Sequence, residues 1–288
     1  MINEDSCVEL IKKSFHKVFH DMGYIVIYSI PVIGAIPMLL IMQILGINLF
    51  SRFFTISGFQ SPSQMPSISM TELGILLIAL GIYILIISIL GIISMIAATI
   101  KANKEESGVH INASDALRES LRYILSVIGA SIIVVLAAIS PFLLGTIIAI
   151  IGGVLHSLAL LGIGSLVMII TLIPVIYIGL RLSLYLQACV IDNLGAIECV
   201  KKCWHVTKGH VLLLFITLLI LNLVALPFSL INIVLPQFQI GTFLSMLIVG
   251  PISAVTLTLI YRGLTEKAES KPSELDNAPI EVGQHNSF

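Results

Sequence analysis

The sequence predicts an all-α polytopic membrane protein with six transmembrane helices, and three observations support this fold class. Apolar residues make up 57% of the 288-residue chain, charged residues only 11%, and the mean hydropathy is +1.07. A soluble domain has about a quarter charged residues, so this chain requires the bilayer as its solvent. Long uncharged stretches follow one another, and the Lys and Arg residues gather between alternate spans. The net charge of −1 argues against a nucleic-acid partner.

Each uncharged stretch is long enough for one or two spanning helices, which need roughly 20 residues each. Residues 22–51 and 73–100 hold one span each, whereas 123–180 and 211–261 hold two each. The turn within 123–180 is expected near Gly152-Gly153 and His156, with Pro141 and Gly145 as the alternative. The predicted spans are 24–47, 73–100, 123–150, 158–181, 211–233 and 242–261. They make 1–264 one membrane domain, followed by a disordered cytoplasmic tail, 265–288.

The distribution of positive charge predicts the orientation of these spans. With the N-terminus inside, 14 of the 15 Lys and Arg residues face the cytoplasm, and only Arg52 lies outside. Cytoplasmic segments of membrane proteins carry such an excess of positive charge. We therefore expect a multi-pass protein of the cytoplasmic (inner) membrane with both termini inside. All four cysteines then lie at or near the cytoplasmic side, where disulfides are rare.

Three cytoplasmic segments, at about 5–20, 114–122 and 193–208, have the helical period of amphipathic helices that lie in the membrane interface. They share a pattern: acid, any residue, aliphatic, base, charged residue, Ser or Cys, large apolar residue, base. The three copies are Glu9–His16, Asp115–Arg122 and Glu198–His205. Two explanations are open. One is a threefold repeat of interfacial helix and hairpin, with its axis along the membrane normal, and the other is convergence of short amphipathic helices.

The candidate functional residues lie in the polar segment 181–210, between spans four and five. Arg181 closes a span, where it either binds a lipid phosphate or a carboxylate substrate, or extends its charge to the interface. Asp192, with Asn193, is expected to cap the next helix, and Asp192 can also pair with Arg181.

The helix that follows holds an aromatic residue and several bases. Trp204, the only Trp, is expected to anchor the helix at the interface. Lys201, Lys202 and Lys208 either attract anionic lipid or serve only to set the topology. A second group in the helix holds Cys199, Cys203 and His205. A zinc site needs at least one more ligand, so these cysteines are expected to be small apolar residues. No metal, cofactor or catalytic residue is predicted.

The same segment carries a resemblance to a known family. It contains Arg181-x-Ser183, a turn with Asp192 and Gly195, a basic helix ending near Trp204, and Lys208-Gly209 before the next span. With Tyr261-Arg-Gly-Leu264, it resembles the membrane domain of glycerophosphoryl diester phosphodiesterases and related uncharacterised bacterial inner-membrane proteins. Cys203 stands where that pattern usually has Ser. In those enzymes a separate soluble barrel performs hydrolysis, whereas only 24 residues follow Leu264 here. The resemblance therefore implies a membrane module without the catalytic domain.

These observations predict a non-enzymatic integral membrane module that acts in membrane or envelope organisation or regulates a partner protein. Its expected partners are membrane lipids and another membrane protein. A small permease or lipid transporter is the alternative, and an integral-membrane enzyme comes third. No predicted span contains Asp or Glu, which proton-coupled carriers commonly use. Gln187 and Asn222 remain as polar candidates near the membrane, with Asn222 expected to bond a neighbouring helix.

Overall fold

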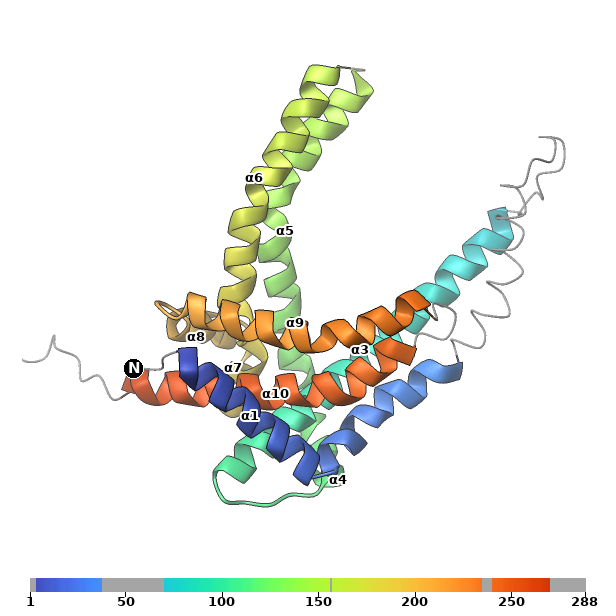
Figure 1. Ribbon diagram of the computed structural model, residues 1–288. Coiled ribbons are helices and arrows are strands. Elements are labelled where there is room, and N and C mark those ends of the chain that lie inside the picture. Colours follow the sequence, from blue (N-terminus) through green and yellow to red (C-terminus); the bar gives the residue numbers. More distant parts are fainter. Residues whose placement is uncertain (1–3, 38–69, 156, 235–239, 270–288) are drawn as a thin grey trace, which may run out of the picture.

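A computed structural model describes residues 4–37, 70–155, 157–234 and 240–269 of the chain (Figure 1). Every regular element in these ranges is an α-helix, which confirms the predicted fold class. The helices are α1 (Glu4–His20), an unlabelled helix (Gly23–Pro37), α3 (Met70–Glu106), α4 (Ala113–Ser120), α5 (Ile124–Val154), α6 (Leu158–Leu182), α7 (Tyr185–Ile191), α8 (Ala196–Val206), α9 (Val211–Val234) and α10 (Ile240–Glu269).

Five of these helices are long and apolar enough to cross a membrane, as a multi-pass protein requires. A sixth is present if α1 and Gly23–Pro37, which meet at a bend of 80°, form one broken span. Of the predicted span 24–47, residues 38–47 lie outside the described residues.

Some helices run further than the sequence analysis predicted. α3 continues to Glu106, past the predicted end of its span at residue 100. α10 continues to Glu269, so residues 265–269 are helical and the predicted disordered tail begins too early. Leu264, directly before these residues, is only 2% exposed and packs in the core. Residues 270–288 lie outside the described residues. Helix α5 ends at Val154 and α6 begins at Leu158, and His156, one of the residues expected at this turn, lies outside the described residues.

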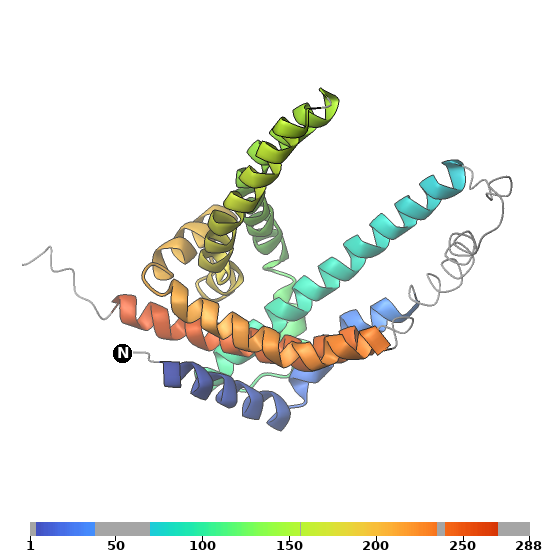
Figure 2. The same cartoon turned by 45° about the horizontal axis from the view of Figure 1, so that its top comes forward.

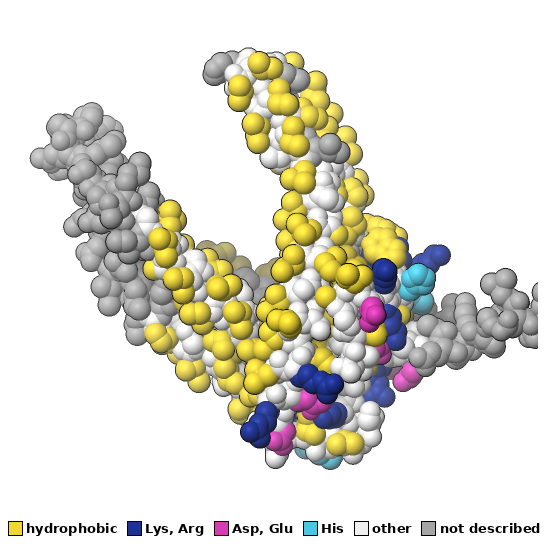
Figure 3. All heavy atoms as spheres, turned by 180° about the vertical axis from the view of Figure 1, so that it is seen from behind, with side chains coloured by type: hydrophobic (Ala, Val, Ile, Leu, Met, Phe, Trp, Pro, Cys, Tyr) yellow, Lys and Arg dark blue, Asp and Glu magenta, His cyan; other side chains and the backbone are white. Residues whose placement is uncertain are grey.

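The long helices diverge as arms from one end of the molecule. α5 and α6 lie side by side in one arm, α9 and α10 in another, and α3 extends in a third direction (Figures 1 and 2). Large apolar side chains on the outer parts of these arms are exposed, as lipid-facing surfaces are. In Figure 3 the charged side chains gather at the end from which the arms diverge.

The α5–α6 arm is closely packed and longer than a bilayer is thick. A Cβ atom at Gly145 would lie 2.6 Å from the Met168 side chain, and one at Gly164 would lie 2.7 Å from the Ala149 backbone nitrogen. These glycines therefore let the two backbones approach, as small residues do between membrane helices. The 31 residues of α5 span about 46 Å, against a hydrocarbon core of about 30 Å. The first third of α5 therefore extends beyond the hydrocarbon when its far end lies at the opposite surface.

The buried core lies where the arms meet, and we call this region the hub. It consists of the short helices α1, α4, α7 and α8 and the parts of the long helices packed against them. Helix α7 lies at its centre, with five of its seven residues buried. Helix α7 could not be predicted from the sequence, because Tyr185–Ile191 continues the apolar sequence of the preceding span without a period of its own.

The three amphipathic segments form helices of their own, α1, α4 and α8, each followed by a break before the next long helix. Among the labelled helices, α1 packs mainly on α10, α4 on α3, and α8 on α5 and α7. Each therefore rests mainly on an arm other than the one into which it leads. Helix α8 lies alongside α5, and its Ala196 is next to Gly129, near the beginning of α5.

Candidate functional site

Arg181, at the end of α6, is buried and connects α6 to α8. Its guanidinium carbon lies 3.8 Å from the centre of the Trp204 ring, and its Nη2 donates a hydrogen bond to the Trp204 backbone carbonyl. Its own backbone carbonyl accepts hydrogen bonds from Thr207 Oγ1 at 3.0 Å and Cys203 Sγ at 3.1 Å. The last turn of a helix has unpaired carbonyls that favour a cation, and Arg181 supplies that cation to α8.

Asp192 does not pair with Arg181, so that prediction is wrong. Its carboxylate accepts a hydrogen bond from the Tyr261 hydroxyl of α10 and forms an ion pair with Lys202 Nζ at 2.7 Å. Both Arg181 and Asp192 therefore hold the hub together, but through different partners. Asp192 connects α7 and α8, which are neighbours in the sequence, to α10, whose Tyr261 is 69 residues away.

Asp192 also does not begin α8, which corrects the predicted helix cap. It ends α7, and the next residue, Asn193, adopts a left-handed conformation with φ 53°. The Leu194 N–H then bonds to the Cys189 carbonyl at 3.2 Å, a pattern typical of helix C-termini. Asn tolerates this conformation better than most residues, so Asp192-Asn193 suits the end of a helix as well as the beginning of one.

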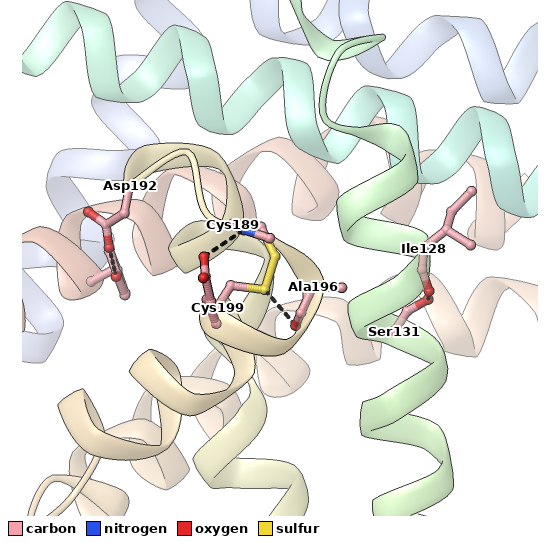
Figure 4. The surroundings of a disulfide bond; sticks show 9 residues. Ile128, Ser131, Cys189, Asp192, Ala196 and Cys199 are labelled. Carbon is pink, nitrogen blue, oxygen red and sulfur yellow. Dashed lines mark hydrogen bonds between the residues drawn. A yellow bond between two sulfur atoms is a disulfide. The ribbon is translucent and has the colours of Figure 1, made fainter.

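Two of the cysteines form a disulfide, which the sequence analysis did not expect. Cys189 of α7 and Cys199 of α8 are bonded, with their Cα atoms 5.0 Å apart, and both are buried (Figure 4). Cys203 is a buried free thiol, and burial raises the pKa of Cys203 to about 12. At neutral pH this thiol is therefore protonated and a weak nucleophile. Within the described residues, no group of three or more His, Cys, Asp and Glu could hold a metal ion.

The bases of α8 fall into two environments. Lys202 is half-buried and paired with Asp192, whereas Lys201 and Lys208 are exposed and have no ion-pair partner among the described residues. Trp204 is 37% exposed, and its ring meets that of Tyr177 edge to face at 6.4 Å between centroids. Lys201 and Trp204 therefore remain accessible on the outer face of α8.

A groove lies beside this face of α8. Its volume is about 500 Å³, and its walls are the apolar surfaces of α5 and α6 together with the Val200–His205 stretch of α8. Lys201 and His205 are its charged or titratable lining residues. Such a groove can hold an apolar chain whose polar end is an anion.

A second polar cluster, missed by the sequence analysis, lies where α1 meets the end of α3. Lys101 is 3% exposed and forms ion pairs with Asp21 at 2.7 Å and Glu105 at 2.9 Å. The Tyr24 hydroxyl donates to Glu105 at 2.8 Å, and Lys17 of α1 lies 3.3 Å from the same carboxylate. The spacing of Lys101 and Glu105, four residues apart on one helix, was the only local signal for this cluster.

Asp21 connects this cluster to the bend after α1. Burial by itself raises the pKa of Asp21, but hydrogen bonds from Lys101 and the Gly23 amide, with the charge of Lys101, outweigh it. The pKa of Asp21 therefore lies below its ordinary value, and the carboxylate is ionised at neutral pH.

The two remaining polar candidates are Asn222, which bonds within its own helix, and Gln187, whose polar atoms are buried without a partner among the described residues. Asn222 donates to the Leu218 carbonyl of its own helix at 2.7 Å, so the expected bond to a neighbouring helix is wrong. Gln187 is fully buried in α7, and neither polar atom of its side chain has a hydrogen-bond partner among the described residues.

No protein-family model matches this chain, and neither does any curated protein sequence or solved structure. The resemblance to the membrane domain of glycerophosphoryl diester phosphodiesterases therefore stays a prediction. The properties of the site follow from its own geometry, which joins a network of buried polar contacts to an exposed basic face of α8.

Proposed function

We propose that this protein is a non-enzymatic module of the cytoplasmic (inner) membrane that organises membrane lipid or regulates a partner membrane protein. One observation carries the proposal. The polar groups of the hub hold its helices together, while the arms carry exposed apolar side chains into the bilayer. A protein of this shape offers neighbouring lipids and proteins a large contact surface.

The proposed orientation places the hub in the cytoplasm. In support, α1, α4, α8 and the ends of α3, α6 and α10 carry most of the cytoplasmic bases of the predicted topology and pack into one unit with α7. Fusing a topology reporter after residue 60 and after residue 270 tests this orientation. The reporter is expected to be external at 60 and cytoplasmic at 270, and an external reporter at 270 would overturn the six-span topology.

Deleting the gene tests the function. The proposal expects an altered lipid profile or an envelope stress response that is restored by the wild-type gene. A deletion strain with an unchanged lipid profile and no envelope stress contradicts it.

The alternative, a small permease or lipid transporter, is favoured by the groove of about 500 Å³ beside α8. Reconstitution in vesicles separates the two functions. If a fluorescent phospholipid moves between leaflets faster than in protein-free vesicles, the protein is a transporter rather than a non-enzymatic module. Turnover of the added lipid would instead indicate an enzyme.

A further inference from the structure

The groove between α5, α6 and α8 has the position expected of a lipid-binding site. With Val154, the far end of α5, placed at the outer surface, the roughly 20 residues that cross the hydrocarbon put Ala137 just inside its cytoplasmic boundary and Ser140 one turn deeper. The same count from Leu158 along α6 reaches Ile178 at the same boundary. Tyr177 and Trp204, which are amphipathic aromatic residues, lie beside it.

The charge of the groove selects for an anion. Lys201 and His205 lie on its α8 side, both exposed, and Lys201 has no ion-pair partner in the part of the chain that the structure describes. Its lining residues include no carboxylate. Glu198, one turn earlier, is directed back to the N–H of Gly195 at 3.4 Å. An anionic group at the mouth of the groove would therefore meet a base without displacing an acid.

Among the described residues, a second groove of the hub has no free base to attract an anion. It measures about 310 Å³ and lies between α1, α9 and α10. Its charged lining residues are Glu9 and Lys13, and Lys13 is already paired with Glu106 at 3.0 Å. The two grooves therefore differ in charge, although both lie between an amphipathic helix and a hairpin.

We propose that the groove of α5, α6 and α8 binds an anionic glycerophospholipid. One acyl chain lies against the apolar walls of α5 and α6, and the phosphate lies at Lys201 and His205. Trp204 lies at the level of the glycerol. The volume of the groove falls within the range of small-molecule sites, and each buried methylene adds to the binding free energy. This inference rests on the proposed placement of the hub at the cytoplasmic surface.

Native mass spectrometry of the purified full-length protein tests the site, with phosphatidylglycerol and phosphatidylcholine added separately. Wild type is expected to retain phosphatidylglycerol in preference to phosphatidylcholine. Lys201→Gln with His205→Gln is expected to lower that retention about five-fold. The matched control is Lys12→Gln with His16→Gln on α1, which removes the same residue types at the same spacing and is expected to retain the lipid.

A second pair of variants tests the acyl chain. Ala137→Phe fills the groove and is expected to abolish retention. Ile139→Phe changes a residue of the same helix that is 47% exposed and does not line the groove, and it is expected to leave retention unchanged. Thermal unfolding of each variant shows whether it is folded. Equal retention by the groove variants and their controls overturns the proposal, and so does equal retention of the two lipids. Displacement of the lipid by inorganic phosphate at equal concentration also overturns it, because the site would then bind a free anion.

The outcome for the groove is separable from that for the proposed function. If the groove variants bind lipid as wild type does while the deletion strain has an envelope defect, only the groove proposal fails. If the variants lose the lipid while the deletion strain has no defect, the lipid site stands and the proposed function fails.

Discussion

Helices α1 and α8 carry the same eight-residue pattern, and equivalent bases in them make equivalent contacts. The first base, Lys12 in α1 and Lys201 in α8, is exposed and has no ion-pair partner among the described residues. The second base, Lys13 or Lys202, is ion-paired to a carboxylate of a neighbouring element. One position of the pattern therefore contacts the surroundings, while the next attaches the helix to the hub.

The Ser or Cys position of the pattern is also buried in the same way in the three helices. Ser14 in α1 and Cys203 in α8 are both fully buried, and so is Ser120 in α4. In α4, Arg118 is exposed and Glu119 pairs with Lys104, as the two preceding positions predict. Each of these helices packs mainly on the arm that precedes its own, so that α1 lies on α10, α4 on α3 and α8 on α5. A triplicated unit would produce this cyclic arrangement, whereas convergence of short amphipathic helices does not require it. Triplication nevertheless stays a prediction.

The two helices differ in how the hub holds them. α1 is held by paired charges, because Lys17 contacts both Glu105 and Glu106, next to the buried Lys101. α8 is held mainly by Arg181, which stacks on Trp204 and donates a hydrogen bond to its backbone carbonyl, and by the disulfide to α7, with the ion pair of Lys202 and Asp192 in addition. Charge pairs weaken with salt and acid, whereas hydrogen bonds to buried backbone depend less on either. The attachment of α1 should therefore be more sensitive to salt and acid than that of α8.

Removing the base at the centre of the α1 attachment is expected to have the largest effect. Lys101→Met leaves the carboxylates of Asp21 and Glu105 without their shared cation, and we expect a loss of about 3–5 kcal/mol in the free energy of unfolding. The matched control is Lys104→Met, whose pair with Glu119 is about a third exposed, and it should cost less than about 1 kcal/mol. SDS titration of the purified protein measures both, and equal losses would contradict the buried network.

Replacing Arg181 is expected to have the next largest effect, on the attachment of α8. Arg181→Gln should cost about 1.5–3 kcal/mol, because hydrogen bonds from a charged donor are lost. Arg181→Lys should not restore the loss, since an ammonium cannot stack on Trp204 as a guanidinium does. Exchanging Arg181 and Asp192 should also fail to restore stability, because the two residues do not pair. A fully stable exchange variant would contradict the described contacts.

Acid is expected to weaken the attachment of α1 before that of α8, and this effect should be smaller than those of the two substitutions above. The pKa of Asp21 is lowered in the folded state, so its stabilising contribution is present above the unfolded pKa of about 3.9 and is lost as the pH falls through the lower folded value. We expect proteolysis near residues 20–23 to rise in this range before the α8 region becomes accessible. Asp21→Asn should be cleaved there at neutral pH already. Identical pH profiles for wild type and Asp21→Asn would show that the carboxylate has no such role.

Exchanging the small residue of the pattern is expected to have the smallest effect. Cys203→Ser places in α8 the residue that α1 and α4 have, and its hydroxyl can donate to the Arg181 carbonyl as the thiol does. We expect a change of about 1 kcal/mol or less, because one hydrogen bond to the Arg181 carbonyl replaces another. With the pKa of Cys203 at about 12, the wild-type thiol should resist maleimide at pH 7 until the protein is unfolded. Rapid labelling of the folded protein would contradict its burial.

The arms of the fold could be predicted from the sequence, and the hub only in part. Uncharged length and helical period are local signals, and they identified the long helices and α1, α4 and α8. The pairings in the hub are not local: the Tyr24 hydroxyl reaches Glu105, 81 residues away, and Arg262 bonds to Asn103, 159 residues away. The sequence therefore identified Asp192 as important but assigned it the wrong partner. Nothing in its neighbourhood indicates Tyr261.

These long connections have a consequence for the order of assembly during synthesis. Tyr261 and Arg262 lie near the end of the last membrane helix and complete contacts with Asp192 and Asn103, which leave the ribosome much earlier. The α5–α6 hairpin can form by itself, because its closest contacts are between neighbouring helices. The polar contacts that α10 makes must wait until that helix has entered the bilayer. Insertion of α10 is thus the step that completes the long-range polar contacts of the hub, and a chain interrupted before it lacks them.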